Sequence, residues 1–158
     1  MTDSSWKHFQ KIENPDKNKS DNFGVSVDMH ENFILVGANN ATGKSKQTGA
    51  VYLFELKANK WQLFQKLFAP DGLADDNFGQ SVSMIDDTIV VGAYTHGSDN
   101  SGACYIFKKD KSGKFAHSQK LVSSATSKTN NYFGRSVSVY ANQLVIGSWG
   151  DSTHAHKS

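Results

Sequence analysis

Two aromatic residues followed by acidic ones are the part of this sequence best suited to hold a ligand. Tyr94 and Trp149 stand 55 residues apart, and Asp99 and Asp151 follow them closely. An aromatic ring can stack on a sugar while a carboxylate accepts its hydroxyl hydrogen bonds, so the pattern is compatible with a shallow carbohydrate site. The interpretation that we favour is that the rings only fill space between structural units. Asn39 precedes Tyr94 by the same 55 residues and is the third candidate of this set.

Histidines offer a second possible chemistry. His96 and the pair His154 and His156 could coordinate a metal through their ring nitrogens. A His-x-His near a chain end is more typical of a solvated tail, so we expect no metal site. No Ser/His/Asp arrangement, phosphate-binding glycine loop or spaced pair of acids recurs in the sequence. We therefore expect a protein that is not an enzyme and needs no cofactor.

Composition narrows the class further. The chain has 158 residues, of which 37% are hydrophobic and 20% charged, with a formal net charge of +2. Such a balance is typical of a globular domain and gives little support to nucleic-acid binding. No apolar run approaches the roughly 20 residues of a spanning helix, so we expect no membrane insertion. The first residues do not resemble a signal peptide, and the compartment is left open.

One seven-residue pattern occurs three times. DNFGVSV, DNFGQSV and NYFGRSV place Phe23-Gly24, Phe78-Gly79 and Phe133-Gly134 at intervals of 55 residues. A second landmark, LVGA, VVGA and VIGS, keeps the same interval and supplies Gly37, Gly92 and Gly147. Regular intervals of this kind indicate a repeat architecture rather than one irregular domain.

Each repeat predicts four short strands, here named A, B, C and D. Runs rich in β-branched and aromatic residues alternate with Gly, Asn, Asp, Ser and Lys clusters, and no helical periodicity appears. Strand B is apolar at almost every position, which predicts burial on both faces. In strand A, Phe23 and Val27 should face one way and Gly24 and Ser26 the other. Four-stranded antiparallel sheets packed radially form an all-β propeller, and a solenoid of stacked hairpins is the alternative.

These residues resemble the FG-GAP repeats found in the integrin α-subunit propeller and in bacterial and algal surface proteins. The resemblance rests on FG-x-SV in strand A, on GA at the end of strand B, and on the GAVYLF that begins at Gly49. It implies a propeller that binds other proteins, with a leaning toward the cell surface. The proline that follows GA in the family is replaced here by Asn39, Tyr94 and Trp149.

Calcium marks a departure from the resemblance. Integrin-type repeats often carry a DxDxDG-like loop between strands A and B, whereas the junctions here are DMHEN, MIDDT and VYANQ. These tight hairpins offer at most two adjacent acids, short of the six or so oxygen ligands that calcium prefers. We therefore expect no calcium site in these loops.

The strand count predicts an incomplete ring within a single domain. Residues 6–12 read as the outer strand of an incomplete blade, 21–68 as blade one, 76–122 as blade two and 131–158 as part of blade three. Three blades cannot close a ring that usually needs about four to eight. Either further blades of a longer chain complete it, or copies associate, most simply as a homodimer.

Loop lengths predict where binding would occur. The D–A and B–C loops are long and emerge at one end of the blades, and the A–B and C–D hairpins are short and emerge at the other. Binding residues usually lie in longer loops on a rigid frame, so we assign binding to the D–A/B–C end. The favoured function is an interaction or adhesion module that binds a protein, and the alternative is a lectin-like module that binds glycans.

Overall fold

Ten strands form three antiparallel sheets in the computed structural model, which describes residues 5–43, 47–124 and 129–150. Sheet one contains β1 (Phe23–His30), β2 (Phe33–Ala38), β3 (Ala50–Lys57) and β4 (Lys60–Leu67). Sheet two contains β5 (Phe78–Ile85), β6 (Thr88–Ala93), β7 (Ala103–Lys109) and β8 (Phe115–Leu121). Sheet three is the hairpin of β9 (Phe133–Tyr140) and β10 (Gln143–Ser148). The described residues hold no α-helix and one short 3-10 turn, η1 (Lys19–Asp21).

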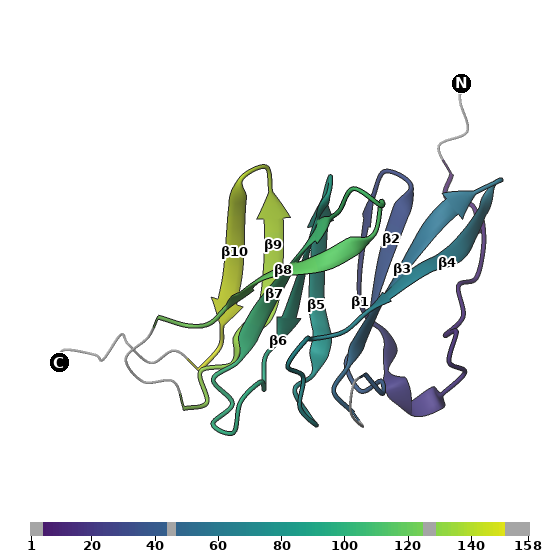
Figure 1. Cartoon of the computed structure of the whole chain (residues 1–158). Helices are drawn as coiled ribbons and strands as arrows, with labels where there is room; N and C mark the ends of the chain where they lie inside the picture. Colours follow the sequence, from purple (N-terminus) through teal and green to yellow (C-terminus); the bar gives the residue numbers. More distant parts are fainter. Residues whose placement is uncertain (1–4, 44–46, 125–128, 151–158) are drawn as a thin grey trace.

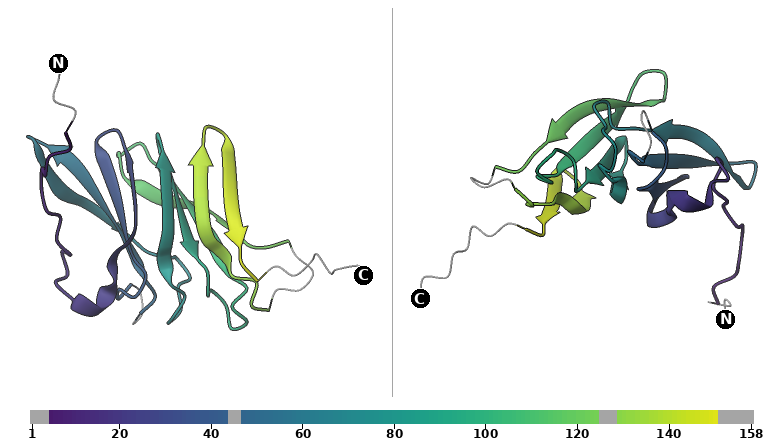
Figure 2. Two further views of the ribbon diagram at one scale, coloured as in Figure 1. Left: turned by 180° about the vertical axis from the view of Figure 1, so that it is seen from behind. Right: turned by 90° about the horizontal axis from the view of Figure 1, so that it is seen from below.

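The sheets stand beside one another as blades and follow an arc when seen from the end (Figures 1 and 2). Strands β1, β5 and β9 contact one another in turn and are the innermost strands of blades 1, 2 and 3. Within each full blade the strand order is A, B, C, D, so the chain moves outward through four neighbouring strands. This confirms the predicted all-β fold of antiparallel propeller blades in an incomplete ring.

Burial of the B strands follows from this packing. Val90 and Val91 in β6 are buried because a blade covers each face of that strand, and Leu35 in β2 is buried against blade 2. Val36, on the other face of β2, is buried in a smaller cluster with Tyr52 and Phe54. Val145 in β10, the equivalent of Val90, is 69% exposed, since no blade covers that side of β10 among the described residues. The same apolar sequence is therefore buried or exposed according to whether a neighbouring blade is present.

Strand A begins with a bulge that the predicted alternation did not include. Phe23 pairs with Ala38 while Ser26 pairs with the next residue, Gly37, so the two residues between them bulge out of the ladder. Gly24 has φ +93°, and its counterparts Gly79 and Gly134 have +90°, values that favour glycine. Placing Gly24 opposite Phe23 by simple alternation was wrong, because the bulge interrupts the two-residue period there.

Successive blades meet through a contact that we call the joint. Ser26 Oγ of blade 1 donates a hydrogen bond of 2.8 Å to the Gly79 carbonyl of blade 2, and Ser81 repeats it to Gly134 at 2.9 Å. A Cβ atom built on Gly37 would lie 2.1 Å from the Gly79 carbonyl oxygen. The joint therefore requires the FG and GA glycines and the serine of the repeated pattern.

The main core fills the first joint. Phe78, on strand A of blade 2, packs edge-on against Tyr105 and Phe107 and is fully buried. Its cluster takes large side chains from the facing sides of blades 1 and 2, namely Phe33, Leu35, Val51, Leu53, Leu67, Phe78, Val82, Met84, Ile89, Val91, Tyr105, Phe107 and Phe115. The two blades thus share their main hydrophobic core, and a smaller cluster around Tyr52 and Phe54 lies on the other side of blade 1.

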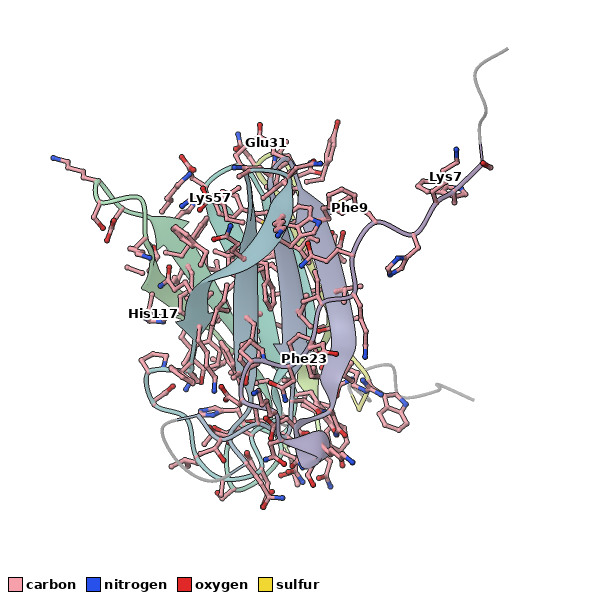
Figure 3. All side chains as sticks on the ribbon, turned by 90° about the vertical axis from the view of Figure 1, so that its right-hand side faces the viewer. Lys7, Phe9, Phe23, Glu31, Lys57 and His117 are labelled. Carbon is pink, nitrogen blue, oxygen red and sulfur yellow. The ribbon has the colours of Figure 1, made fainter. Side chains whose placement is uncertain are left out.

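Residues 6–12 do not form the predicted outer strand. A strand in the D position pairs with a strand in the C position, and no sheet precedes blade 1 among the described residues. Gln10 nevertheless exchanges two hydrogen bonds with the main chain of Trp61, at 2.9 and 3.2 Å. Gln65 of β4 makes the same pair with Phe115 of β8, at 2.8 and 3.0 Å. The segment, which carries Lys7 and Phe9 in Figure 3, thus holds an outer-strand position beside blade 1.

We predict that Gly37→Ala lowers the free energy of unfolding by about 3 kcal/mol, because the new Cβ collides with the main chain of blade 2. Gly72→Ala is the matched control, since Gly72 lies in a loop outside the joints and a Cβ there comes no closer than 3.2 Å to another atom, the Ala69 Cβ. Its stability should stay within about 1 kcal/mol of the wild type. Urea unfolding measures both values, and equal losses would show that the joint does not carry the constraint.

Candidate functional site

Long loops gather at one end of the blades, which we call the loop face. The D–A and B–C connections lie at the lower end in Figure 1, and the two-residue A–B hairpins lie at the upper end. Every loop-face residue discussed below belongs to a strand end or to one of these long loops. The loop face therefore lies directly beside the joints, at the ends of the B strands and the starts of the A strands.

At the first joint, the loop-face residues are amides. Asn39 is 8% exposed and hydrogen bonds to Asn22 of its own blade at 3.0 Å. Its Nδ2 donates to Asn77 at 3.1 Å and to Gln80 at 2.7 Å, both on blade 2. The predicted site residue Asn39 is thus occupied by contacts across the joint.

At the second joint, the equivalent residues are aromatic and cationic. The Tyr94 ring lies 6.0 Å from the Tyr132 ring of blade 3, and the Arg135 guanidinium lies 5.0 Å from the Tyr94 centroid. The Tyr132 ring in turn lies 5.8 Å from that of Trp149, which is 74% exposed. Both predicted aromatic residues therefore belong to one row with Tyr132 and Arg135, which we call the aromatic row.

Two members of the aromatic row were missed in the sequence. Arg135 holds the position of Val25 and Gln80 in the other repeats, and the sequence pattern gave no direction for its side chain. The bulge at Gly134 turns this position toward the end of strand B in the preceding blade. The signal available in the sequence was the 55-residue interval, which aligns Arg135 with Gln80 and Tyr132 with Asn77. Gln80 and Asn77 are the residues that contact Asn39, the equivalent of Tyr94.

His96 lies beneath the loop face in a polar network. Its Nδ1 is 2.7 Å from Asp76 Oδ2, and its Nε2 is 2.7 Å from Lys120 Nζ. A lysine ammonium can only donate, so Nε2 accepts and the ring proton is on Nδ1, directed to the buried Asp76. Both ring nitrogens are therefore engaged in holding the loops. In blade 1, Ala41 takes the place of His96, and Asp21 Oδ1 is buried without a hydrogen-bond partner among the described residues.

An aspartate in each of the first two D–A loops fastens that loop to the following blade. Asp71 accepts hydrogen bonds from Tyr105 Oη at 2.8 Å and Lys120 Nζ at 2.7 Å. Asp16 accepts from Tyr52 Oη at 2.8 Å and from the Lys66 ammonium in the same way. The two anchors repeat the same chemistry and give the loop face a fixed frame.

Protonation at the Asp71 anchor follows from these contacts. Burial opposes the charge on Asp71, but hydrogen bonds from Lys120 and then Tyr105 outweigh burial and lower its pKa to about 2. Burial, followed by the hydrogen bond to Asp71, raises the pKa of Tyr105. The carboxylate is therefore ionised and the phenol neutral over the whole physiological range, so the anchor stays closed.

The remaining predicted site residues divide into two groups. Asp99 Oδ1 accepts a hydrogen bond from the Ser101 amide at 3.1 Å, and its carbonyl accepts one from the Asn130 amide at 2.7 Å. It thus shapes the B–C loop and ties it to the next D–A loop. Asp151, His154 and His156 lie outside the described residues.

Metal-binding clusters and exposed thiols are absent from the described ranges. No group of three or more His, Cys, Asp or Glu residues that could hold a metal ion occurs in the described part of the chain. The thiol of Cys104 is fully buried, and burial raises its pKa to about 12, so it stays protonated. No helix in the described part is long and apolar enough to cross a membrane.

Radial blades joined at their inner strands define the class of this protein as a β-propeller module. The model of the FG-GAP repeat matches three segments of the chain, residues 6–54, 61–107 and 115–158. The chain therefore belongs to the FG-GAP repeat family, as its sequence resemblance indicated. These repeats, together with the similarity to integrin α subunits given next, indicate a propeller-type interaction module.

Two integrins are among the relatives of the chain. It is 32% identical to integrin alpha-2 of Bos taurus over 127 aligned residues, which cover 73% of this chain and 11% of the integrin. It is 29% identical to integrin alpha-2 of Mus musculus with the same coverage. The chain thus spans about a tenth of the length of these relatives.

We predict that Asp71→Asn weakens the anchor in a pH-dependent way. The pKa of about 2 lies below the usual 3.8, so the ionised carboxylate adds stability above pH 4, which is lost as the pH falls toward 2. Because the side chain is 49% exposed, we expect a loss of only about 1 kcal/mol at pH 7. Urea unfolding at a series of pH values should show this difference disappear near pH 2.

Asp75→Asn is the matched control for this measurement, because Asp75 is an exposed residue of the same loop. It should stay within about 0.5 kcal/mol of the wild type throughout. A difference between wild type and Asp71→Asn that stays constant from pH 7 to pH 2 would contradict the anchor.

Proposed function

We propose that the chain is a non-enzymatic interaction module that binds a partner protein through its loop face. The observation that carries this proposal is the aromatic row on that face. Exposed aromatic residues and arginine are the residue types enriched at the centres of protein interfaces. Here three rings and one guanidinium lie together at the second joint, between Tyr94 and Trp149.

The frame beneath the row supports the same proposal. The Asp71 and Asp16 anchors and the His96 network hold the long loops against the blades. A rigid frame lowers the entropy that ordering a binding surface would cost. Arg135 keeps an exposed cationic group at the row, which favours a partner that presents a carboxylate there.

A second candidate function is a lectin-like module that binds glycans. The observation in its favour is the exposed ring of Trp149 beside that of Tyr132, a surface on which a sugar could stack. We propose further that the ring is completed by self-association or by further blades of a longer chain.

The test presents the labelled chain to an array of purified extracellular proteins and, in parallel, to a glycan array. We expect saturable binding to a protein that is weakened about tenfold or more by Arg135→Gln, a variant carrying the residue native to the equivalent position 80. Lys111→Gln removes the same charge from the opposite end and should bind as the wild type does. If Arg135→Gln leaves the affinity unchanged, the partner does not bind at the loop face and this part of the proposal is wrong.

The glycan arm separates the two candidate functions. Saturable sugar binding that Trp149→Ala abolishes, with no protein bound, would favour the lectin-like module. A blank glycan array together with protein binding would favour the first proposal.

A further inference from the structure

We propose that the open sides of blade 1 and blade 3 are two halves of one joint, and that a second copy of this chain supplies the complementary half to each. The inference specifies the self-association part of the proposed function and rests on it. We call the side of a blade that carries Phe23, Val27 and Met29, or their equivalents, the entry face. The opposite side, which carries Ser26, Asp28 and Gly37 or their equivalents, is the exit face.

Both joints inside the chain pair an exit face with an entry face by the same bonds. At the first joint, Ser26 donates to the Gly79 carbonyl, and Asp28 Oδ2 accepts from the Met84 amide at 2.7 Å. At the second joint, Ser81 donates to the Gly134 carbonyl, and Ser83 Oγ accepts from the Val139 amide at 3.2 Å. In both joints a serine hydroxyl donates to a glycine carbonyl, and a side-chain oxygen accepts from the amide five residues after that glycine in strand A.

The exit face of blade 3 carries the donor half of this rule. Ser136, Ser138 and Gly147 stand where Ser81, Ser83 and Gly92 stand one blade earlier. Gly92 is closed by the Gly134 carbonyl, 1.9 Å from the position of a Cβ, whereas around Gly147 only atoms of Ser136 are near. Val145, equivalent to the buried Val90, is exposed on this face.

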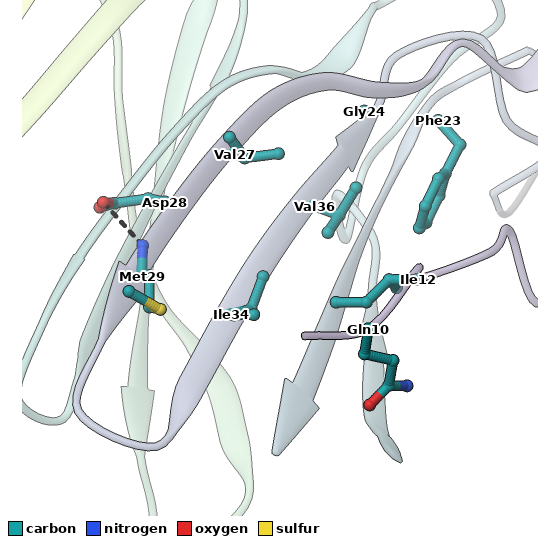
Figure 4. Close-up of a pocket in the computed structure, with 9 residues that line it drawn as sticks. All are labelled: Gln10, Ile12, Phe23, Gly24, Val27, Asp28, Met29, Ile34 and Val36. Carbon is teal, nitrogen blue, oxygen red and sulfur yellow. Dashed lines mark hydrogen bonds between the residues drawn. The ribbon is translucent and has the colours of Figure 1, made fainter. Parts of the chain in front are cut away.

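The entry face of blade 1 carries the acceptor half. Val27 and Met29 are 66% and 64% exposed, while their equivalents Val82 and Met84 are buried in the first joint. Nothing lies within 4 Å of a Cβ position on Gly24, whereas Gly79 has the Ala50 carbonyl oxygen 2.6 Å away. A cavity of about 530 Å³ opens here, lined by Phe23, Val27, Met29, Ile34 and Val36 among others (Figure 4).

The loop-face ends of the two halves also match. Across the first joint Asn39 meets Gln80, an amide pair, and across the second Tyr94 meets Arg135, a cation–π pair. The residues left in these positions are Trp149 on the exit side and Val25 on the entry side, both exposed. An indole against a valine is an apolar pair, so the unpaired ends are complementary in chemistry as well as in position.

The N-terminal segment indicates what the entry face receives. Residues 6–12 hold an outer-strand position beside blade 1, fixed by the two bonds between Gln10 and Trp61. A sheet seated on the entry face would have this segment at its outer side. The described part of blade 3 consists of its two inner strands, β9 and β10. Blade 3 of a second copy would therefore bring the two inner strands of a blade whose outer position this segment already holds.

Such a contact joins different surfaces of the two copies, head to tail, rather than one patch to itself. Ser136 of one copy then donates to the Gly24 carbonyl of the other. Ser138 accepts from the Met29 amide, which in the single chain donates to Asp28 Oδ1 at 2.8 Å. Two copies can form two such joints in a closed ring. Because every copy carries both halves, the complementary face is present at the same concentration as the chain itself.

The test measures the mass of the 158-residue chain in solution by sedimentation velocity and light scattering. Val27→Arg blocks the entry face and Val145→Arg blocks the exit face, and both residues are exposed, so each variant should keep the melting temperature of the unassociated fold. We expect the wild type at a multiple of 17.4 kDa and each variant alone at 17.4 kDa. An equimolar mixture of the two variants retains one intact joint and should regain a two-copy species.

Three results would overturn the proposal. If the wild-type chain stays at 17.4 kDa at every concentration, copies do not associate, and the open faces would be covered by further blades of a longer chain. Association that survives both variants would place the contact on another surface. Association lost with Val27→Arg but kept with Val145→Arg would mean that entry faces meet each other. Arg135→Gln should leave the mass unchanged, so failure of ligand binding and failure of association can be told apart.

Discussion

A main-chain carbonyl pressed against a glycine is the contact on which the arrangement of the blades depends. The Gly79 carbonyl reaches Gly37 so closely that no side chain fits between them, and Ser26 donates a hydrogen bond to the same oxygen. Close approach of two main chains excludes water and lets large side chains such as Phe78 interdigitate behind it. Because every joint repeats these demands, the chain repeats the same glycines, phenylalanine and serine at an interval of 55 residues.

The joints fix the main-chain positions of the loop face, and its side chains vary only where the joints do not constrain them. The joint fixes the main chain at the end of strand B and the start of strand A, so positions 39, 94 and 149 lie in equivalent places. Their side chains differ, and the joint ends are amide in one case and aromatic with arginine in the next. The same joint geometry can thus present different side chains, and so different binding chemistry, at successive blades.

Much of the fold could be predicted from the sequence because the joint leaves a strong pattern in it. The strands, their burial and the motif residues Phe23, Gly24 and Gly37 followed from spacing and residue size. The site was less predictable, since the network around His96 occurs in blade 2 alone of the two full blades. In blade 1 the equivalent residue is Ala41, which cannot form it. The direction of the Arg135 side chain depends on a bulge that strand alternation does not reveal. Residues 6–12 form a strand only if a neighbouring strand is present to pair with them, and the described residues contain none.

Amide hydrogen exchange across the joints tests the central claim most directly. The amide of Phe78 bonds to the Thr48 carbonyl of blade 1, and that of Phe133 to the Ser101 carbonyl of blade 2, both at 3.0 Å. If the joint carries the fold, blades cannot separate without global unfolding, and these amides should exchange as slowly as that of Val91 inside sheet two. Much faster exchange at Phe78 and Phe133 than at Val91 would show that the blades part independently, and would contradict the account.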